Sequence, residues 1–278
     1  MRLRWLSGIV FVPVLIWISR TGGAPFLFLI YATVIMGLHE FYSLMEAKEI
    51  NPSRKLGIAA VLVLTTLVFV SGTAHLGLFL AAFLLVLTVR ELFRETMTFP
   101  IYDIATTFFG VAYVGWLVLH LLLLRQLPAS IGLHDSMGGH FVLMTFFCVW
   151  SCDTAAFFVG TTLGKHKLLP RVSPKKSVEG AVGGFAASVG CALLARVWFA
   201  QHPGGEPLLS VGQAVIFGSL LGILGQLGDL VESLIKRDAD VKDSSDTIPG
   251  HGGILDRLDS LVFSAPMAFY FLKLVVFR

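Results

Sequence analysis

The stretch VGQAVIFGSLLGILGQLGDLVESL, residues 211–234, decides the fold of this chain. As a helix it is long enough to cross the ~30 Å hydrocarbon core of a bilayer. It is apolar until Asp229 and Glu232 appear near its end. An ionisable side chain inside a membrane span is costly and usually faces an internal cavity. The stretch therefore predicts a membrane helix that ends in a polar site.

Similar apolar runs recur along the whole chain. Of its 278 residues, 55% are hydrophobic and 14% are charged, whereas soluble domains average about 25% charged residues. We predict an all-α polytopic integral membrane protein with about nine transmembrane helices. The first run continues into further spans without a convincing cleavage site, so we interpret it as a helix rather than a signal peptide. The predicted spans are roughly 5–19, 25–45, 56–71, 75–90, 103–124, 140–160, 180–200, 211–234 and 257–277.

The positions of Lys and Arg predict how the chain is oriented. Sixteen of the 21 lie at the N-terminus or after the second, fourth, sixth and eighth spans. The other five are Arg20, Arg125, Arg196, Lys273 and Arg278. Because positive charge marks the cytoplasmic side, we expect a cytoplasmic N-terminus and an external C-terminus. We divide the chain into N-terminal spans within 1–137 and C-terminal spans within 138–278, which carry the motifs described below, with cytoplasmic loops at 161–179 and 235–255.

Two spans carry ionisable residues where lipid-facing helices have none. Asp153 lies well inside the sixth span, either lining a polar site or paired with a basic group for packing. In the eighth span Asp229, Glu232, Ser233 and Lys236 follow helical spacing and form one stripe. A solvated helix face would explain such a stripe, but this one begins within an apolar segment. Cys148, Cys152 and Cys191 have no metal-ligand spacing, and we expect them to be small core residues.

The stretch IPGHGGILDRLDS, residues 248–260, opens the last span. Glycines on both sides of His251 break the backbone, and a helix with Asp256, Asp259 and Ser260 on one face follows. A helix start favours anions, whereas the carboxylates favour a cation, so the stretch suits a metal–phosphate complex. Mg²⁺ prefers such oxygen ligands and is commonly held by one or two carboxylates plus substrate phosphates.

A basic loop follows the sixth span. Membrane orientation or contact with anionic lipid would explain Lys165 and Lys167 as well as a role in a binding site would. The block SPKKSVEG is more specific, because Ser173, Lys175, Lys176 and Ser177 place hydroxyl and ammonium groups together. Such a cluster can neutralise a triphosphate, with each Lys acting as a point charge. It lacks the spacing of a P-loop.

These motifs resemble those of the phosphatidate cytidylyltransferases. The segment SLIKRDADVKDSSDTIPGHGGILDRLD, residues 233–259, is similar to the family signature at every specified position. SPKKSVEG resembles a second family block with Ser177 in place of the usual Thr, and CDTAAFFVG, residues 152–160, resembles a third. The similarity covers roughly residues 150–260, and the first five spans share only their apolar character.

The resemblance implies that CTP and phosphatidate react to give CDP-diacylglycerol and pyrophosphate. It also implies an integral protein of the bacterial inner membrane, with the site at the cytoplasmic face, a homodimer, Mg²⁺ and a second, monovalent cation, K⁺, and no nucleic-acid partner. On this basis we expect Asp229 and Asp256 to hold Mg²⁺, with Glu232 and Asp259 serving the second cation or the outer shell.

The resemblance also assigns the phosphate ligands. Ser173, Lys175, Lys176 and Ser177 are expected to bind CTP phosphates, and Asp153 to line the nucleotide pocket or support the metal. The remaining phosphate oxygens, including those of the lipid, fall to Lys236, Arg237, Lys242 and Arg257. His251 is expected to orient a phosphate or move a proton. A general base is not strongly needed, because the attacking phosphate is already ionised.

Three other functions remain open at this point. A CTP-dependent lipid kinase would transfer the γ-phosphate instead of the cytidylyl group. A transporter would hold phosphate between broken helices, although the polar residues gather toward one face and no internal repeat is evident. A structural membrane protein would carry these charges incidentally. The CDP-alcohol phosphotransferases are excluded, because their four-aspartate pattern is absent.

Overall fold

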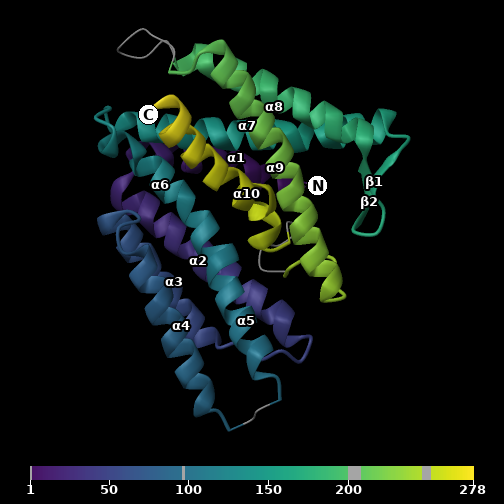
Figure 1. Ribbon diagram of the computed structural model, residues 1–278. Helices are drawn as coiled ribbons and strands as arrows, with labels where there is room; N and C mark the ends of the chain where they lie inside the picture. The colour runs from purple at the N-terminus through teal and green to yellow at the C-terminus, as the bar shows by residue number, and fades with distance from the viewer. Residues whose placement is uncertain (1, 96–97, 200–207, 246–251) are drawn as a thin grey trace.

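The computed structural model describes residues 2–95, 98–199, 208–245 and 252–278, and these residues are mostly helical (Figure 1). The elements in chain order are α1 Arg2–Thr21, α2 Gly23–Glu46, α3 Arg54–Ser71, α4 Leu76–Leu92, α5 Pro100–Gly110, a π-helical turn Val111–Trp116, α6 Leu117–Ser130, α7 Ser136–Leu163, β1 Lys167–Leu169, β2 Ser173–Ser177, α8 Val178–Phe199, α9 Val211–Asp238, α10 Leu255–Phe271 and a π-helical turn Leu272–Val276.

Each of the nine predicted apolar segments is helical. Among the described residues, seven helical segments are long and apolar enough to cross a membrane. The two others are α4, with 17 residues, and α1, whose described apolar part Phe11–Thr21 is shorter still. The chain is therefore an all-α polytopic integral membrane protein. Nine crossings, with the N-terminus inside and the C-terminus outside, stay a prediction.

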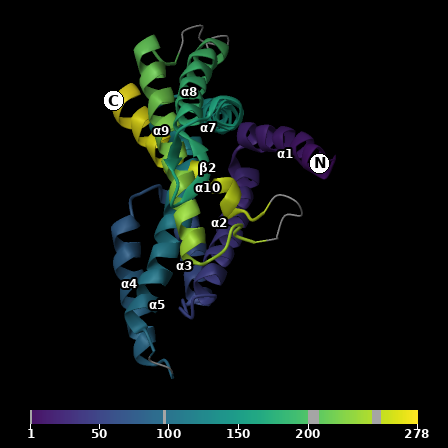
Figure 2. The same ribbon diagram turned by 90° about the vertical axis from the view of Figure 1, so that its right-hand side faces the viewer.

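The helices form two groups that meet at α6 and α10. In one group α7, α8, α9 and α10 pack in succession. In the other α2, α3 and α5 pack around the π-helical turn Val111–Trp116, with α4 against α3 and α5. α7 runs across α9 and α10 instead of alongside them, as the two views in Figures 1 and 2 show. Since α6 is buried on nearly all sides, it forms the centre of the apolar core.

The predicted loop 161–179 is more regular than expected. α7 continues to Leu163, and β1 then pairs antiparallel with β2 in a short hairpin, with Lys167 opposite Ser177. Helix α8 begins directly after β2. The basic block is therefore held on a defined hairpin, which projects beside α7 and α8 in Figure 1.

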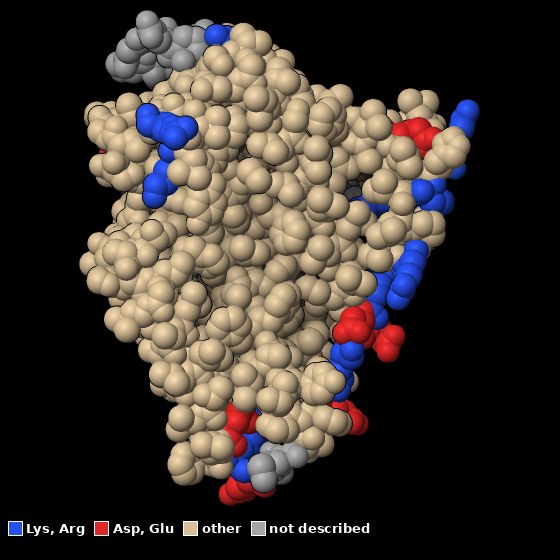
Figure 3. All heavy atoms as spheres, in the orientation of Figure 1, with Lys and Arg blue, Asp and Glu red and all other residues tan. Residues whose placement is uncertain are grey.

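Charge is unevenly distributed over the surface. In the face shown in Figure 3, Lys, Arg, Asp and Glu gather along the edge that holds the hairpin and the end of α9, and at the lower tip. The broad face between them is uncharged, apart from a few basic groups near the top. The cysteines are free; Cys148 and Cys152 are buried and Cys191 is half-buried, which agrees with the core placement that we expected.

Candidate active site

Helices α9 and α10 run antiparallel and pack directly against each other (Figure 1). Gly228 makes a close approach possible, because a Cβ atom at this position would overlap the backbone carbonyl oxygen of Asp259. The acidic residues of α9 thus meet those of α10 along one seam.

Three carboxylates from three helices gather at this seam. Asp153 of α7 accepts a hydrogen bond from Ser260 of α10, with 3.3 Å between Oδ1 and Oγ. The charge of Asp229 on α9 acts on both Asp153 and Asp259, so the three groups repel one another. One cation reaches them from the hairpin, since Nζ of Lys176 lies 2.6 Å from Oδ2 of Asp229. The sixth span, the eighth span and the basic block, separate in the sequence, therefore meet here.

A second charged set lies one turn further along the seam. Nζ of Lys236 is 2.6 Å from Oε2 of Glu232 and 2.5 Å from Oδ1 of Asp256. The other oxygen of Asp256 accepts hydrogen bonds from the backbone N–H groups of Ser244 and Gly253 and from the Ser244 hydroxyl. Asp256 thus fixes the chain that leads into α10, in addition to meeting Lys236.

Glu40, a buried carboxylate of α2, contacts this region and was not among the predicted site residues. One oxygen accepts a hydrogen bond from the Ser245 hydroxyl at 2.7 Å, and the other lies 3.0 Å from the Ser244 hydroxyl, which shares its single proton between Glu40 and Asp256. The two oxygens also accept from the backbone N–H groups of Ile254 and Leu255, at 2.9 and 3.0 Å. These N–H groups lie at the start of α10, where a helix has unsatisfied donors. An ionisable residue within an apolar segment is costly, and this argument singled out Asp153. It applies equally to Glu40, so it could have identified Glu40 from the sequence.

The hairpin is tied to the start of α8. Ser177 is buried, and its Oγ accepts a hydrogen bond from the backbone N–H of Gly180 at 3.1 Å, as a helix cap does. Glu179 accepts hydrogen bonds from the backbone N–H groups of Lys165 and His166 and contacts the His166 ring at 2.6 Å. Lys175 remains exposed. These contacts hold both ends of the hairpin against the start of α8, and the hairpin places Lys176 at the seam.

The structure brings some of the predicted site residues into contact at the seam. The charge of Asp229 acts on Asp153 and Asp259. Asp256, in contrast, contacts Lys236, which also contacts Glu232. Ser233 is 3.5 Å from Asp229. Of the other predicted residues, Ser173 is half-buried on β2, and Arg237, Lys242 and Arg257 are exposed. Arg237 donates to the backbone oxygen of Val241. His251 lies outside the described residues.

The acidic side chains of the seam suit a hard cation, because each of them would bind it through oxygen atoms. Asp153, Asp229 and Asp259 repel one another, and a positive charge among them would relieve that repulsion. Within the described ranges, however, no three His, Cys, Asp or Glu side chains are spaced to enclose an ion as they stand. Lys176 and Lys236 supply the positive charge in this arrangement.

Comparison with known proteins identifies the family. A family model described as the cytidylyltransferase family matches residues 2–275. The chain belongs to this cytidylyltransferase family. Similar relatives are each named phosphatidate cytidylyltransferase. Those of Bacillus subtilis and Synechocystis are both 34% identical, over 99% and 98% of this chain and 98% and 97% of their own lengths. A relative from Brucella suis is 34% identical over 98% of this chain and 93% of its own. The cytidylyltransferase match thus includes the first five spans, beyond the region of resemblance found in the sequence.

Proposed function

We propose that this chain transfers the cytidylyl group of CTP to phosphatidate, which gives CDP-diacylglycerol and pyrophosphate. The observation that carries the proposal is the seam at which Lys176 contacts Asp229, whose charge acts on Asp153 and Asp259. Ammonium groups that bind phosphate and carboxylates that bind a cation come together there, in a membrane protein whose relatives are named for this activity.

The reaction joins two anions, so charge is its main barrier. A phosphate oxygen of phosphatidate attacks the α-phosphorus of CTP, and the bond to the β-phosphate breaks as pyrophosphate leaves. Lys176, with Lys175, Ser173 and Ser177, is positioned on the hairpin to bind the CTP phosphates. The remaining phosphate oxygens fall to Lys236 at the seam and to Arg237, Lys242 and Arg257. Catalysis then rests on positioning and electrostatic stabilisation, and His251 serves to orient a phosphate.

Mg²⁺ is the metal that this donor set fits, and when bound it supplies charge neutralisation at the phosphates. We propose that Asp229 holds it together with a carboxylate of α10. Asp256 is the ligand expected from the resemblance, but it is engaged by Lys236 and by the chain before α10. The backbone oxygen of Asp259 lies against Gly228, and the charge of the neighbouring Asp229 acts on the Asp259 carboxylate. K⁺ is proposed as the second cation, at the set that contains Glu232.

The location and assembly of the site complete the proposal. The charged edge in Figure 3 supports a site at one membrane face, and the Lys and Arg distribution supports the cytoplasmic face. The bacterial relatives support the inner membrane. A homodimer is proposed from the family resemblance, and cross-linking in native membranes tests it.

A turnover assay of the purified protein tests the function. CTP labelled on the cytidine and phosphatidate should yield labelled lipid and free pyrophosphate, without any membrane gradient. EDTA should abolish turnover, and Mg²⁺ should restore it. In Mg²⁺ titrations, whichever of Asp256→Asn and Asp259→Asn raises the Mg²⁺ requirement identifies the α10 ligand. Labelled free CDP with a phosphorylated lipid alcohol would instead indicate a lipid kinase, and the absence of any product would refute catalysis.

A further inference from the structure

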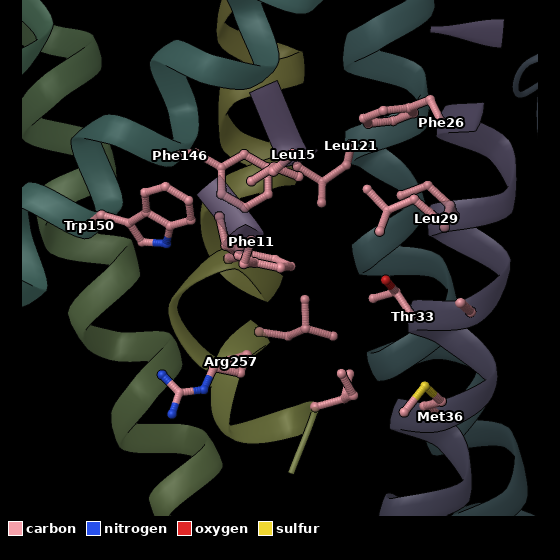
Figure 4. Close-up of a pocket in the computed structure, with 15 residues that line it drawn as sticks. Phe11, Leu15, Phe26, Leu29, Thr33, Met36, Leu121, Phe146, Trp150 and Arg257 are labelled. Carbon is pink, nitrogen blue, oxygen red and sulfur yellow. The ribbon is translucent and has the colours of Figure 1, made fainter. Parts of the chain in front are cut away.

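A cavity of about 380 Å³ lies between α1, α2, α6, α7 and α10 (Figure 4). This volume is within the usual range for small-molecule sites. Its lining is almost wholly apolar, and Arg257 is the one charged residue among the described residues that line it. Phe11 and Ala32, which also line it, are exposed at the surface of the helix bundle. The cavity therefore opens toward the lipid between α1 and α2.

The two ends of this cavity differ in chemistry. Figure 4 places Arg257 and Met36 at one end, and Phe26, Leu121 and Phe146 at the other. Arg257 directly follows Asp256, which contacts Lys236 at the seam. The cavity thus starts beside the charged residues of the candidate active site and ends among aromatic and aliphatic side chains.

The depth of the cavity matches one leaflet of a bilayer. Met36 and Phe26 lie ten residues apart on α2, which at ~1.5 Å per residue corresponds to about 15 Å. The hydrocarbon core of a bilayer is about 30 Å thick, so its half-thickness is also about 15 Å. A cavity of this depth, with a cationic group at its mouth, is complementary to one acyl chain of an anionic lipid in the leaflet next to the site.

We propose that this cavity binds one acyl chain of phosphatidate, with Arg257 beside its phosphate, and that its closed end limits the length of that chain. This inference rests on the proposed function. The open side between α1 and α2 provides lateral entry from the membrane. Leu29 points into the cavity about 10 Å from Met36, by the helical rise over seven residues. A larger side chain at Leu29 would block a long chain but leave room for a short one.

A comparison of a long-chain and a short-chain phosphatidate as substrates tests this inference. Purified Leu29→Trp is assayed with dipalmitoyl and dihexanoyl phosphatidate at saturating CTP. We expect kcat/KM for the dipalmitoyl lipid to fall about tenfold or more relative to the dihexanoyl lipid, since pocket contacts with single methylenes are worth 10-fold or more. Leu29→Ala should keep turnover of the long chain. Phe28→Trp is the matched control, because Phe28 is 68% exposed on the same helix and should leave the ratio unchanged.

The outcomes separate this inference from the proposed function. An unchanged ratio in Leu29→Trp, or an equal change in Phe28→Trp, would overturn the acyl-chain site while turnover itself still supports the function. If Leu29→Trp fails to fold, Ala32→Phe at the opening replaces it with the same expected ratio. Should the wild-type protein use neither lipid, a phosphatidate with a photoreactive chain end still tests the cavity. Labelling of residues 26–33 that excess unlabelled phosphatidate suppresses supports it, and labelling that does not saturate opposes it.

Discussion

Single carboxylates at the α9–α10 seam have distinct surroundings. Asp229 meets two other carboxylates and one lysine, whereas Asp256 is enclosed by backbone donors and Lys236. Burial makes repulsion between like charges stronger than it is in water. A cation that enters beside Asp153, Asp229 and Asp259 therefore relieves a repulsion that burial has strengthened.

Replacement of Asp229 by Asn should abolish most turnover without unfolding the protein. The change removes the carboxylate that faces both Lys176 and the other acids, and loss of one electrostatic group at a reacting centre costs about 100-fold or more in kcat. The measurement is kcat with CTP and phosphatidate at high Mg²⁺. Asp238→Asn serves as the control, because Asp238 is an exposed residue of the same helix and pairs with Lys48 at 2.5 Å. Equal turnover in the two variants would rule out this role of Asp229.

Replacement of Glu40 by Gln should destabilise the protein. The Gln amide offers one acceptor oxygen where the carboxylate offers two, and its NH₂ group would face donors of Ser244, Ser245 or the start of α10. Hydrogen bonds to charged groups contribute about 1.5–3 kcal/mol each, so the unfolding temperature in detergent should fall clearly.

Glu46→Gln provides the comparison on the same helix. Glu46 is more exposed and pairs with Arg54 at 2.7 Å, and exposed ion pairs contribute only about 0–1 kcal/mol. A fall in unfolding temperature as large in Glu46→Gln as in Glu40→Gln would mean that the contacts of Glu40 are not special.

The sequence pointed to the acidic residues that the structure brings to the seam, and the expected Mg²⁺ pair of Asp229 and Asp256 stays a prediction. Helical spacing placed Asp229, Glu232 and Lys236 on one face, as in the structure. It contained no information on the offset between α9 and α10, which depends on the close backbone contact at Gly228. That offset decides which acid of α10 meets Asp229. Glu40 was missed because its partners lie in another part of the chain.

At the scale of helices, glycine at the α9–α10 contact determines the spacing of the site. Gly228→Ala should force the two helices apart, because the added Cβ would overlap the Asp259 carbonyl oxygen, a backbone atom that cannot rotate away. We expect a lower unfolding temperature and a loss of turnover.

Gly190→Ala on α8 is the matched control, since nothing lies within 4 Å of the Cβ that it would add. Ala favours a helix over Gly by roughly 0.5–1 kcal/mol, so this variant should be as stable as the wild type or slightly more so. If Gly228→Ala behaved in the same way, close packing at the seam would not limit the site.

Helix positions were predictable because each apolar run is a local property of the sequence. The ends were less so: the run Pro100–Ser130 extends beyond the predicted 103–124, since the π-helical turn continues the helix instead of ending it. The hairpin Lys167–Ser177 was expected only as a loop. Its strands are short and basic, without the alternation of apolar residues that marks a strand.

At the scale of the whole molecule, the chain before α7 and the hairpin after it should lie on opposite sides of the membrane. Single cysteines are introduced after Cys148, Cys152 and Cys191 have been replaced by Ala. A membrane-impermeant maleimide should label His134→Cys in intact cells, because His134 is exposed in the chain between α6 and α7. Lys167→Cys, exposed on the hairpin, should be labelled only after permeabilisation. The reverse pattern would invert the predicted topology, and labelling of both in intact cells would place the hairpin outside.

The contacts of Glu40 also constrain the order in which the protein matures. Its carboxylate belongs to α2, whereas Ser244 is made 204 residues later. At ~5–20 residues per second, that interval lasts about 10–40 s. During this time the nascent helix carries an acid without the donors that later surround it, and a chain released early never acquires them. All four donors to Glu40 are present only once synthesis has passed Leu255.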